Sequence, residues 1–152
     1  MIILPDQFNA VRRVHPDAAI GYTSGVFDLF HTGHANYIEA CKCRCDILVV
    51  GVDSDRLARS RKGFPRPIQG IGERVGNVGR HAHYVFTKDA PSEYYTGVLR
   101  PGFYFYSKDN VVSSEKRRKL SEDPYFRDAI FIPYTRNIST TELLNSGLQG
   151  ID

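Results

Sequence analysis

The sequence of 152 residues contains no long apolar run, and this lack excludes one class of protein. A membrane-spanning helix needs about 20 consecutive, mostly apolar residues, and no segment of this chain provides them. The opening residues, Met1 to Pro5, form a short apolar run without a cationic flank or a cleavage-like site, which argues against a secretory signal. We therefore expect no membrane association and a cytoplasmic location.

Cysteine is also scarce, and its spacing does not suit a metal site. The only three cysteines alternate in the segment CKCRC as Cys41, Cys43 and Cys45. In a helix, Cys41 and Cys45 can share a face while Cys43 points away. Zinc sites usually have two-residue gaps and a fourth ligand, so we expect reduced, structural cysteines and predict no metal ligand among the protein side chains. A metal or redox role is the less favoured alternative.

The chain lacks a strong excess of charge, since its formal net charge is only +3. No basic stripe is interleaved with aromatic residues, so a nucleic-acid partner is the less favoured alternative. The cations are nevertheless concentrated in one short segment, which suits a polyphosphate ligand, although a solvated helix face is an even alternative for the first two of them. The segment contains Arg56, Arg59, Arg61, Lys62 and Arg66. Lys62 and Arg66 flank turn residues, where a loop could close over a bound triphosphate.

The segment GVFDLFHTGH, residues 25–34, is the most informative part of the sequence. The residues before it are apolar and β-branched and predict a strand, whereas those after it predict a helix. A helix that begins near Thr32 directs its free N–H groups and the positive end of its dipole at the turn, where anionic oxygens are stabilised. The pattern therefore predicts a phosphate site at a strand-to-helix turn.

Two histidines and two glycines give this turn its predicted chemistry. His31 and His34 are three residues apart, so both imidazoles can lie on one side of the first helical turn and donate hydrogen bonds to a phosphate. Gly25 and Gly33 permit close approach of the backbone. Asp28 suits an N-cap or turn position equally well, and we interpret it as structural.

The order of apolar segments predicts an α/β fold of a single domain over residues 1–152. Strands alternate with helices, a pattern typical of a Rossmann-like, three-layer α/β/α architecture with a parallel five-stranded sheet. In such sheets the ligand lies beyond the carboxyl ends of the strands. We expect strands over residues 20–27, 47–53, 84–87, 102–107 and 129–133, and helices over 33–44, 54–60, part of 73–83, and from Ser139 onward.

Two motifs together resemble a known family. GVFDLFHTGH is similar to the HxGH signature of the nucleotidyltransferase superfamily, and ISTTELL at 138–144 is similar to the ISTT element of its cytidylyltransferase-like branch. Lys62, the RPI run at 66–68, and Glu73 with Arg74 fall where that branch carries basic phosphate ligands. The first half resembles heptose-1-phosphate adenylyltransferases most, and the ISTT end equally resembles glycerol-phosphate cytidylyltransferases.

The resemblance implies transfer of a nucleoside monophosphate from ATP or CTP to a phosphorylated sugar or polyol, with release of pyrophosphate and assistance by Mg²⁺. The implied partners are a nucleoside triphosphate and a phosphorylated small-molecule acceptor. The implied catalytic residues are His31, His34, Lys62 and Arg74, with Lys62 and Arg74 on the β- and γ-phosphates. The implied nucleotide-binding residues are Gly25, Val26, Phe27, Gly33, His34, Ser107, Asp109, Ile138, Ser139, Thr140 and Thr141, and the implied acceptor-binding residues are Asp53 and Arg66. Ser139 with Glu142 also fits a helix capping box, and one residue can serve both purposes.

Three departures from the family pattern keep a second function open. Gly76, Asn77 and Gly79 disfavour a long helix before His83, so a short or irregular one is expected there. Arg136 lies two residues before the ISTT isoleucine instead of four, and Ser107 to Asp109 replace an expected glycine and paired acidic residues. The alternative function is a non-catalytic nucleotide-binding module of the same fold. The choice between ATP and CTP and the identity of the acceptor stay open.

Aromatic residues are numerous, with 9 Tyr and 9 Phe but no Trp. Many lie in residues 94–106 and 125–134, where packing in edge strands and the core is the favoured interpretation. A homodimer contact is the alternative. The basic run KRRK at 116–119 is interpreted as a solvated helix face, with phosphate binding as the less favoured alternative.

Overall fold

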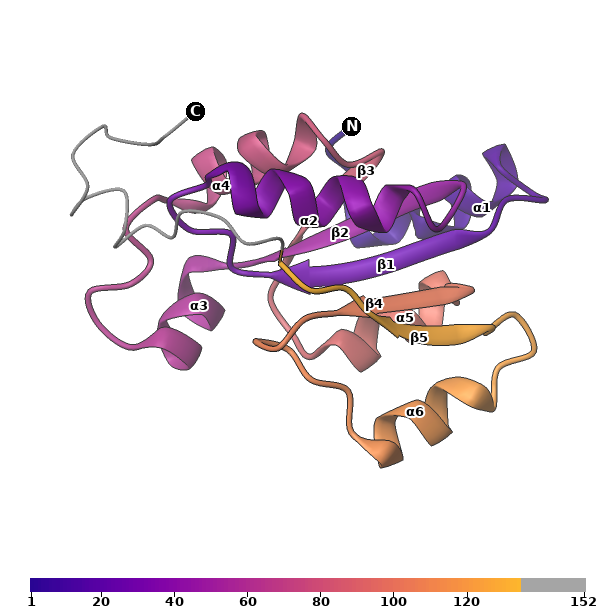
Figure 1. The fold of residues 1–152 in the computed structure, drawn as a ribbon. Helices are drawn as coiled ribbons and strands as arrows, with labels where there is room; N and C mark the ends of the chain where they lie inside the picture. The colour runs from indigo at the N-terminus through magenta and orange to yellow at the C-terminus, as the bar shows by residue number, and fades with distance from the viewer. Residues whose placement is uncertain (135–152) are drawn as a thin grey trace.

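The computed structural model describes residues 1–134, and its centre is one parallel sheet of five strands in the order β3-β2-β1-β4-β5 (Figure 1). All four strand pairs are parallel; in β1, for example, Gly21 pairs with Leu48 on one side and Phe103 on the other. The predicted five-stranded parallel sheet is therefore confirmed. The strands are β1 (Ile20–Gly25), β2 (Ile47–Asp53), β3 (Tyr84–Lys88), β4 (Phe103–Tyr106) and β5 (Asp128–Phe131).

Helices cover both faces of the sheet and complete the predicted three-layer architecture (Figure 1). The first face packs against α2 and α4, and the second packs against α1, α5 and α6. The short helix α3 lies beyond the carboxyl end of β2 (Figure 1). The helices are η1 (Pro5–Gln7), α1 (Phe8–Val14), α2 (Thr32–Lys42), α3 (Asp55–Lys62), α4 (Ile71–Gly79), α5 (Ser92–Leu99) and α6 (Ser114–Ser121).

The interior strand β2 separates two apolar clusters. All of its residues are buried, as expected for a strand with helices on both faces. Because side chains alternate along a strand, Leu48, Val50 and Val52 face α2 and α4, whereas Ile47 and Val49 face α1 and α5. Asp53, at the end of the same strand, lies on the same face as Ile47 and Val49.

Most predicted limits differ from the observed ones by one or two residues, and two of the differences have a clear physical cause. The first strand ends at Gly25 instead of residue 27, because Phe27 and Leu29 adopt left-handed backbone angles (φ 54° and 52°) that no strand accommodates. The helix expected within 73–83 spans Ile71–Gly79, since Arg74, Val75 and Val78 bury one face and outweigh its glycines. The predicted helix from Ser139 lies outside the described residues.

In the described part of the chain, no helix has the length and apolar character needed to cross a membrane.

Candidate phosphate-binding site

The turn between β1 and α2 places both predicted histidines at a helix start. His31 is the N-cap of α2, with an extended backbone (φ −142°, ψ −179°), and the helix begins at Thr32. The N–H of Gly33 donates to Nδ1 of His31 at 3.0 Å, and the N–H of His31 donates to Nδ1 of His34 at 3.2 Å. The two side chains therefore cap the helix reciprocally, as Ser and Glu do in a capping box.

This capping fixes the tautomer of each imidazole. A neutral imidazole has one acceptor nitrogen and one N–H donor, and Nδ1 serves as the acceptor in both rings. The proton of each ring therefore lies on Nε2, opposite the capping contact. The two rings lie 4.1 Å apart, measured between centroids, and His34 stacks on Phe30 at 5.3 Å. Both histidines are thus fixed hydrogen-bond donors.

Burial keeps both imidazoles neutral. It lowers the pKa of His34 to about 4, with a further lowering from the neighbouring His31, and it lowers the pKa of His31 as well. Neutral Nε2–H groups beside a helix N-terminus donate hydrogen bonds to an anion without carrying a charge of their own. This environment is suited to phosphate oxygens on which charge increases during a reaction.

A pocket lined by His34 opens at the carboxyl ends of β1 and β4, the neighbouring strands where the strand order reverses. His31 does not line this pocket, and its ring lies 4.1 Å from that of His34. Eight predicted site residues line it: Gly25, Val26, Phe27, His34, Lys62, Arg66, Ser107 and Asp109. Sequence reasoning assigned no site role to four further polar lining residues, Ser24, Arg61, Asn110 and Tyr134, or to Asp28 beyond a structural one. Arg61 had a signal in the basic segment, whereas Ser24 and Asn110 had none. The predicted residues Ile138, Ser139, Thr140 and Thr141, with Arg136, lie outside the described residues.

Asp28 connects this turn to the loop that carries Arg66. Its carboxylate, which is 1% exposed, accepts hydrogen bonds from Arg66 Nε at 2.6 Å and from the backbone N–H groups of Ile68 and Gln69 at 2.8 and 2.9 Å. Burial alone favours the neutral acid, but these donors outweigh burial and hold the pKa of Asp28 below its usual value. The arrangement agrees with the structural interpretation of Asp28.

Arg74 is not among the residues that line the pocket, and its contacts disfavour the predicted role on the β- and γ-phosphates. The side chain is fully buried. Its Nη1 donates to the carbonyl oxygens of Val26 and Asp53 at 2.9 and 2.7 Å, Nε donates to Gln69 O at 2.9 Å, and Nη2 pairs with Asp55 at 2.6 Å. Because these four acceptors occupy the guanidinium, the geometry favours a positioning role that joins the turns bordering the pocket.

Asp53 and Gly33, also predicted to contact ligands, are buried behind the pocket surface. The carboxylate of Asp53 has no exposed area and lies 2.8 Å from Nη1 of Arg61 and 3.5 Å from Nζ of Lys88. Gly33 is buried in the first turn of α2. Asp53 therefore contacts Arg61, which does line the pocket, and a direct contact of Asp53 with an acceptor is disfavoured.

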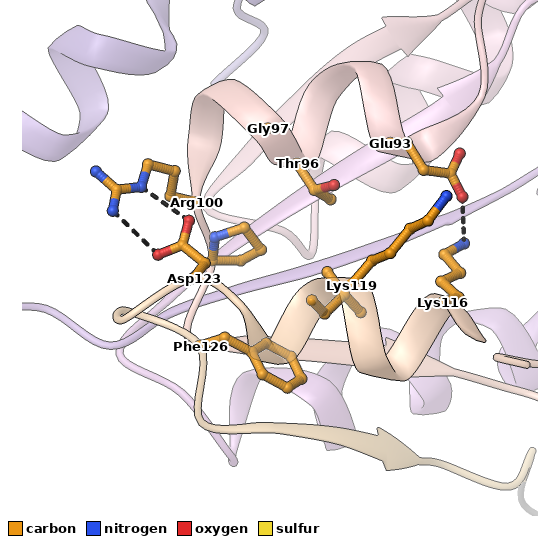
Figure 2. Close-up of a pocket in the computed structure, with 10 residues that line it drawn as sticks. Glu93, Thr96, Gly97, Arg100, Lys116, Lys119, Asp123 and Phe126 are labelled. Atoms are coloured by element: carbon orange, nitrogen blue, oxygen red, sulfur yellow. Dashed lines mark hydrogen bonds and ion pairs between the residues drawn. The ribbon is translucent and has the colours of Figure 1, made fainter. Parts of the chain in front are cut away.

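A larger cavity of about 260 Å³ lies between α5 and α6, on the second face of the sheet (Figure 2). Its charges pair with one another: Arg100 lies 2.8 Å from Asp123, and Lys116 lies 3.7 Å from Glu93. Unlike the first pocket, this cavity has no histidine in its lining and does not border the N-terminus of α2. We therefore base the functional interpretation on the pocket beside α2.

Residues 1–134 contain no group of three or more His, Cys, Asp or Glu side chains arranged to hold a metal ion. No cysteine lines the pocket, although Cys41 belongs to the same apolar cluster as the lining residues Phe27 and Tyr134. Cys41 is buried, Cys43 is exposed, and Sγ of the half-buried Cys45 lies 3.5 Å from the carbonyl oxygen of Cys41.

Fold and site together define a Rossmann-like α/β protein with an anion-binding pocket at the strand switch point. The sequence profile of the cytidylyltransferase-like family matches residues 22–144, and the chain belongs to this family. The match confirms the resemblance inferred from the HTGH and ISTT motifs.

Known proteins support this placement. The bifunctional protein HldE of Acidiphilium cryptum (strain JF-5) is 33% identical over 105 residues, 64% of this chain and 21% of that protein. Ethanolamine-phosphate cytidylyltransferase of Arabidopsis thaliana is 38% identical over 128 residues, 78% of this chain and 29% of that protein. The chain thus spans less than a third of the length of these relatives.

A solved structure shares the fold. The lipopolysaccharide core biosynthesis protein from Thermoplasma volcanium GSS1 matches with a TM-score of 0.66 and 21% identity, over 76% of this chain and 96% of that one.

Proposed function

We propose that this protein is a nucleotidyltransferase that transfers a nucleoside monophosphate from ATP or CTP to a phosphorylated sugar or polyol and releases pyrophosphate. The observation that carries the proposal is the pair of neutral imidazoles at the start of α2, whose Nδ1 atoms are engaged by the backbone and whose Nε2–H groups have no hydrogen-bond partner among residues 1–134. Membership of the cytidylyltransferase-like family supports it, as do the names of the relatives.

The proposed reaction needs no enzyme nucleophile. A phosphate oxygen of the acceptor attacks the α-phosphorus of the nucleotide in line, a new P–O bond forms, and the bond from the α-phosphorus to the bridging oxygen breaks. The electron pair of that bond leaves with pyrophosphate. His31 and His34 donate hydrogen bonds to the α-phosphate and the bridging oxygen, where negative charge increases, and the N-terminus of α2 adds its own dipole.

Cations around the pocket hold the rest of the triphosphate. Lys62 lines the pocket and is assigned to the β- and γ-phosphates. Arg66, which the resemblance assigned to the acceptor, is reassigned to the same phosphates, because its ion pair with Asp28 fixes its position beside the histidine turn. Ser139 and Thr140, outside the described residues, remain proposed triphosphate contacts.

Mg²⁺ stays part of the proposal as an ion that arrives on the nucleotide, whose phosphate oxygens are ligands it prefers. Arginines engage Asp28 and Asp53, whereas Asp109 is exposed at the pocket and is the carboxylate that fits such an ion. When bound, Mg²⁺ supplies neutralisation of the phosphate charge.

A pyrophosphate-release assay tests the proposal. The protein is incubated with Mg²⁺, each of the four nucleoside triphosphates in turn and a panel of phosphorylated sugars and polyols, and products are identified by mass spectrometry. Release that requires both an acceptor and ATP or CTP, with formation of the nucleoside-diphosphate conjugate, supports the proposal. Nucleotide binding in a thermal-shift assay without release under any combination contradicts it and favours the non-catalytic module.

A further inference from the structure

Three charged side chains, those of Asp53, Lys88 and Arg61, form a cluster that extends from the protein interior to the pocket. Asp53 ends β2, Lys88 ends β3, and Arg61 lies in the last turn of α3. The Asp53 carboxylate contacts Arg61 Nη1 at 2.8 Å and Lys88 Nζ at 3.5 Å. The side chains of Asp53 and Lys88 are 0% and 6% exposed, whereas that of Arg61 is 33% exposed.

The second cation, Arg61, distinguishes this charged cluster from an ordinary buried ion pair. Lys88 alone already neutralises Asp53, and burying charged groups costs free energy unless they are paired. Arg61 adds a further positive charge to the pair, so the three groups together carry a net charge of +1. Asp53 engages one guanidinium nitrogen, Nη1, and the other nitrogens of Arg61, which lines the pocket, have no hydrogen-bond partner among residues 1–134.

This charged cluster lies on the side of the sheet opposite the histidines. Asp53 and Lys88 share the strand face of Val49 and Phe86, which pack with α1 and α5, whereas α2, which carries His34, packs on the other face. Ser24 also points to the α5 side, since its Oγ lies 3.4 Å from Ser92 Oγ. The pocket therefore has a histidine side and an Arg61 side, joined across the end of β1.

In-line transfer requires exactly such separation in space, because the attacking and leaving oxygens lie on opposite sides of the α-phosphorus. We propose that Arg61 binds the phosphate of the acceptor, and that Asp53, held by Lys88, is the positioning residue that orients the Arg61 guanidinium. This inference rests on the proposed function and deepens it. In the same pocket, Ser24 and Asn110 offer a hydroxyl and an amide for acceptor hydroxyl groups, with Asn110 Nδ2 lying 3.4 Å from Ser24 Oγ.

The test is steady-state kinetics in which acceptor and nucleotide are varied separately. Arg61→Gln removes a charge-assisted contact, worth about 1.5–3 kcal/mol, so we expect the acceptor KM to rise by about 10-fold or more. The nucleotide KM is expected to change by less than about threefold. Arg61→Lys keeps the charge but not the fork, and we expect it to recover part of the loss. Arg13→Gln, an exposed residue of α1, removes the same charge away from the pocket and is the matched control.

Asp53 is tested with a pair of variants. Asp53→Asn leaves Lys88 buried without its partner, so the double variant Asp53→Asn/Lys88→Met, which removes both buried charges, accompanies it. We expect the double variant to raise the acceptor KM as Arg61→Gln does, with an unchanged nucleotide KM.

The outcomes separate the two proposals. If the wild-type protein releases no pyrophosphate, the proposed function is wrong, and this inference is wrong as well. Normal wild-type turnover with an unchanged acceptor KM in Arg61→Gln, or with a rise in the nucleotide KM alone, overturns only the assignment of Arg61.

Discussion

The backbone N–H of His31 donates to Nδ1 of His34 at 3.2 Å, so the first histidine of the HTGH turn fixes the ring of the second. The ring of His31 is fixed in the same way by the N–H of Gly33 at 3.0 Å. Each imidazole thus combines a structural contact through Nδ1 with an Nε2–H donor that no residue in the described part of the chain engages. These two roles can be separated by substitution, because an asparagine oxygen can replace Nδ1 but no asparagine atom replaces Nε2–H.

We therefore expect His31→Asn to fold with nearly wild-type stability, since asparagine is among the best N-cap residues. Its kcat should fall by about 10²-fold or more, because a donor to the transition state is lost, while nucleotide affinity is largely kept. His31→Ala should lose the same activity and, in addition, about 1 kcal/mol of stability. Pyrophosphate release and chemical denaturation measure both quantities. An asparagine variant with near wild-type kcat would rule out the donor role.

The low pKa of His34 predicts a pH dependence of stability. Because the folded protein holds this pKa at about 4, below the value of about 6.5 in an unfolded chain, the unfolded state binds the proton more readily. The stabilising contribution is therefore complete above pH of about 6.5 and is lost as pH falls towards 4. We expect the free energy of unfolding to fall more steeply over this range in wild type than in His34→Asn. Equal slopes in urea denaturation at several pH values would show that His34 titrates normally.

Asp28→Asn tests the connection between the histidine turn and the Arg66 loop. The substitution removes the charge that pairs with Arg66 and one of the acceptor oxygens used by Arg66, Ile68 and Gln69. We expect a loss of about 1–3 kcal/mol in the free energy of unfolding, and a higher nucleotide KM because Arg66 is no longer held at the pocket. Denaturation and kinetics on the same preparation measure both effects. Unchanged stability would mean that this carboxylate does not hold the loop.

Arg74 distinguishes a positioning residue from a phosphate ligand. A lysine amine cannot reach the carbonyl oxygens of Val26, Asp53 and Gln69 and the carboxylate of Asp55 together, so Arg74→Lys leaves buried acceptors unpaired. We expect it to lose about 3 kcal/mol or more of stability, similar to Arg74→Met. If Arg74→Lys keeps wild-type stability and changes only the nucleotide KM, Arg74 contacts phosphate and the positioning role is wrong.

Local patterns predicted the fold well. Residues 47–53 are continuously apolar up to Asp53, and the predicted strand has the same limits as β2. The turn after β1 was placed correctly as a strand-to-helix connection, but its start was not, because a positive φ at Phe27 leaves no mark in an apolar sequence. The limits of α4 depended on burial of Val75 and Val78 against the sheet, which glycine propensities alone do not reveal.

The site was less predictable for side chains whose direction is set by tertiary contacts. The sequence predicted Arg74 as a ligand of the β- and γ-phosphates and Asp53 as an acceptor-binding residue, and each contacts a residue that lines the pocket. Their direction depends on partners from distant segments, such as Val26 O for Arg74 and Lys88 for Asp53, and no spacing rule encodes those contacts. The same tertiary contacts turn Arg61 towards the pocket, although it first appeared only as one cation of a basic segment.

The most direct test of the account is a two-dimensional ¹H–¹⁵N NMR spectrum of the imidazole nitrogens, recorded near pH 7 with and without nucleoside triphosphate and Mg²⁺. The account predicts neutral Nε2–H tautomers for His31 and His34 in the free protein, and displacement of both Nε2 resonances when ATP or CTP is added. Single asparagine variants assign the two signals. Nδ1–H tautomers, or Nε2 resonances that do not move when a nucleotide binds, would contradict the claim that these histidines face the phosphates.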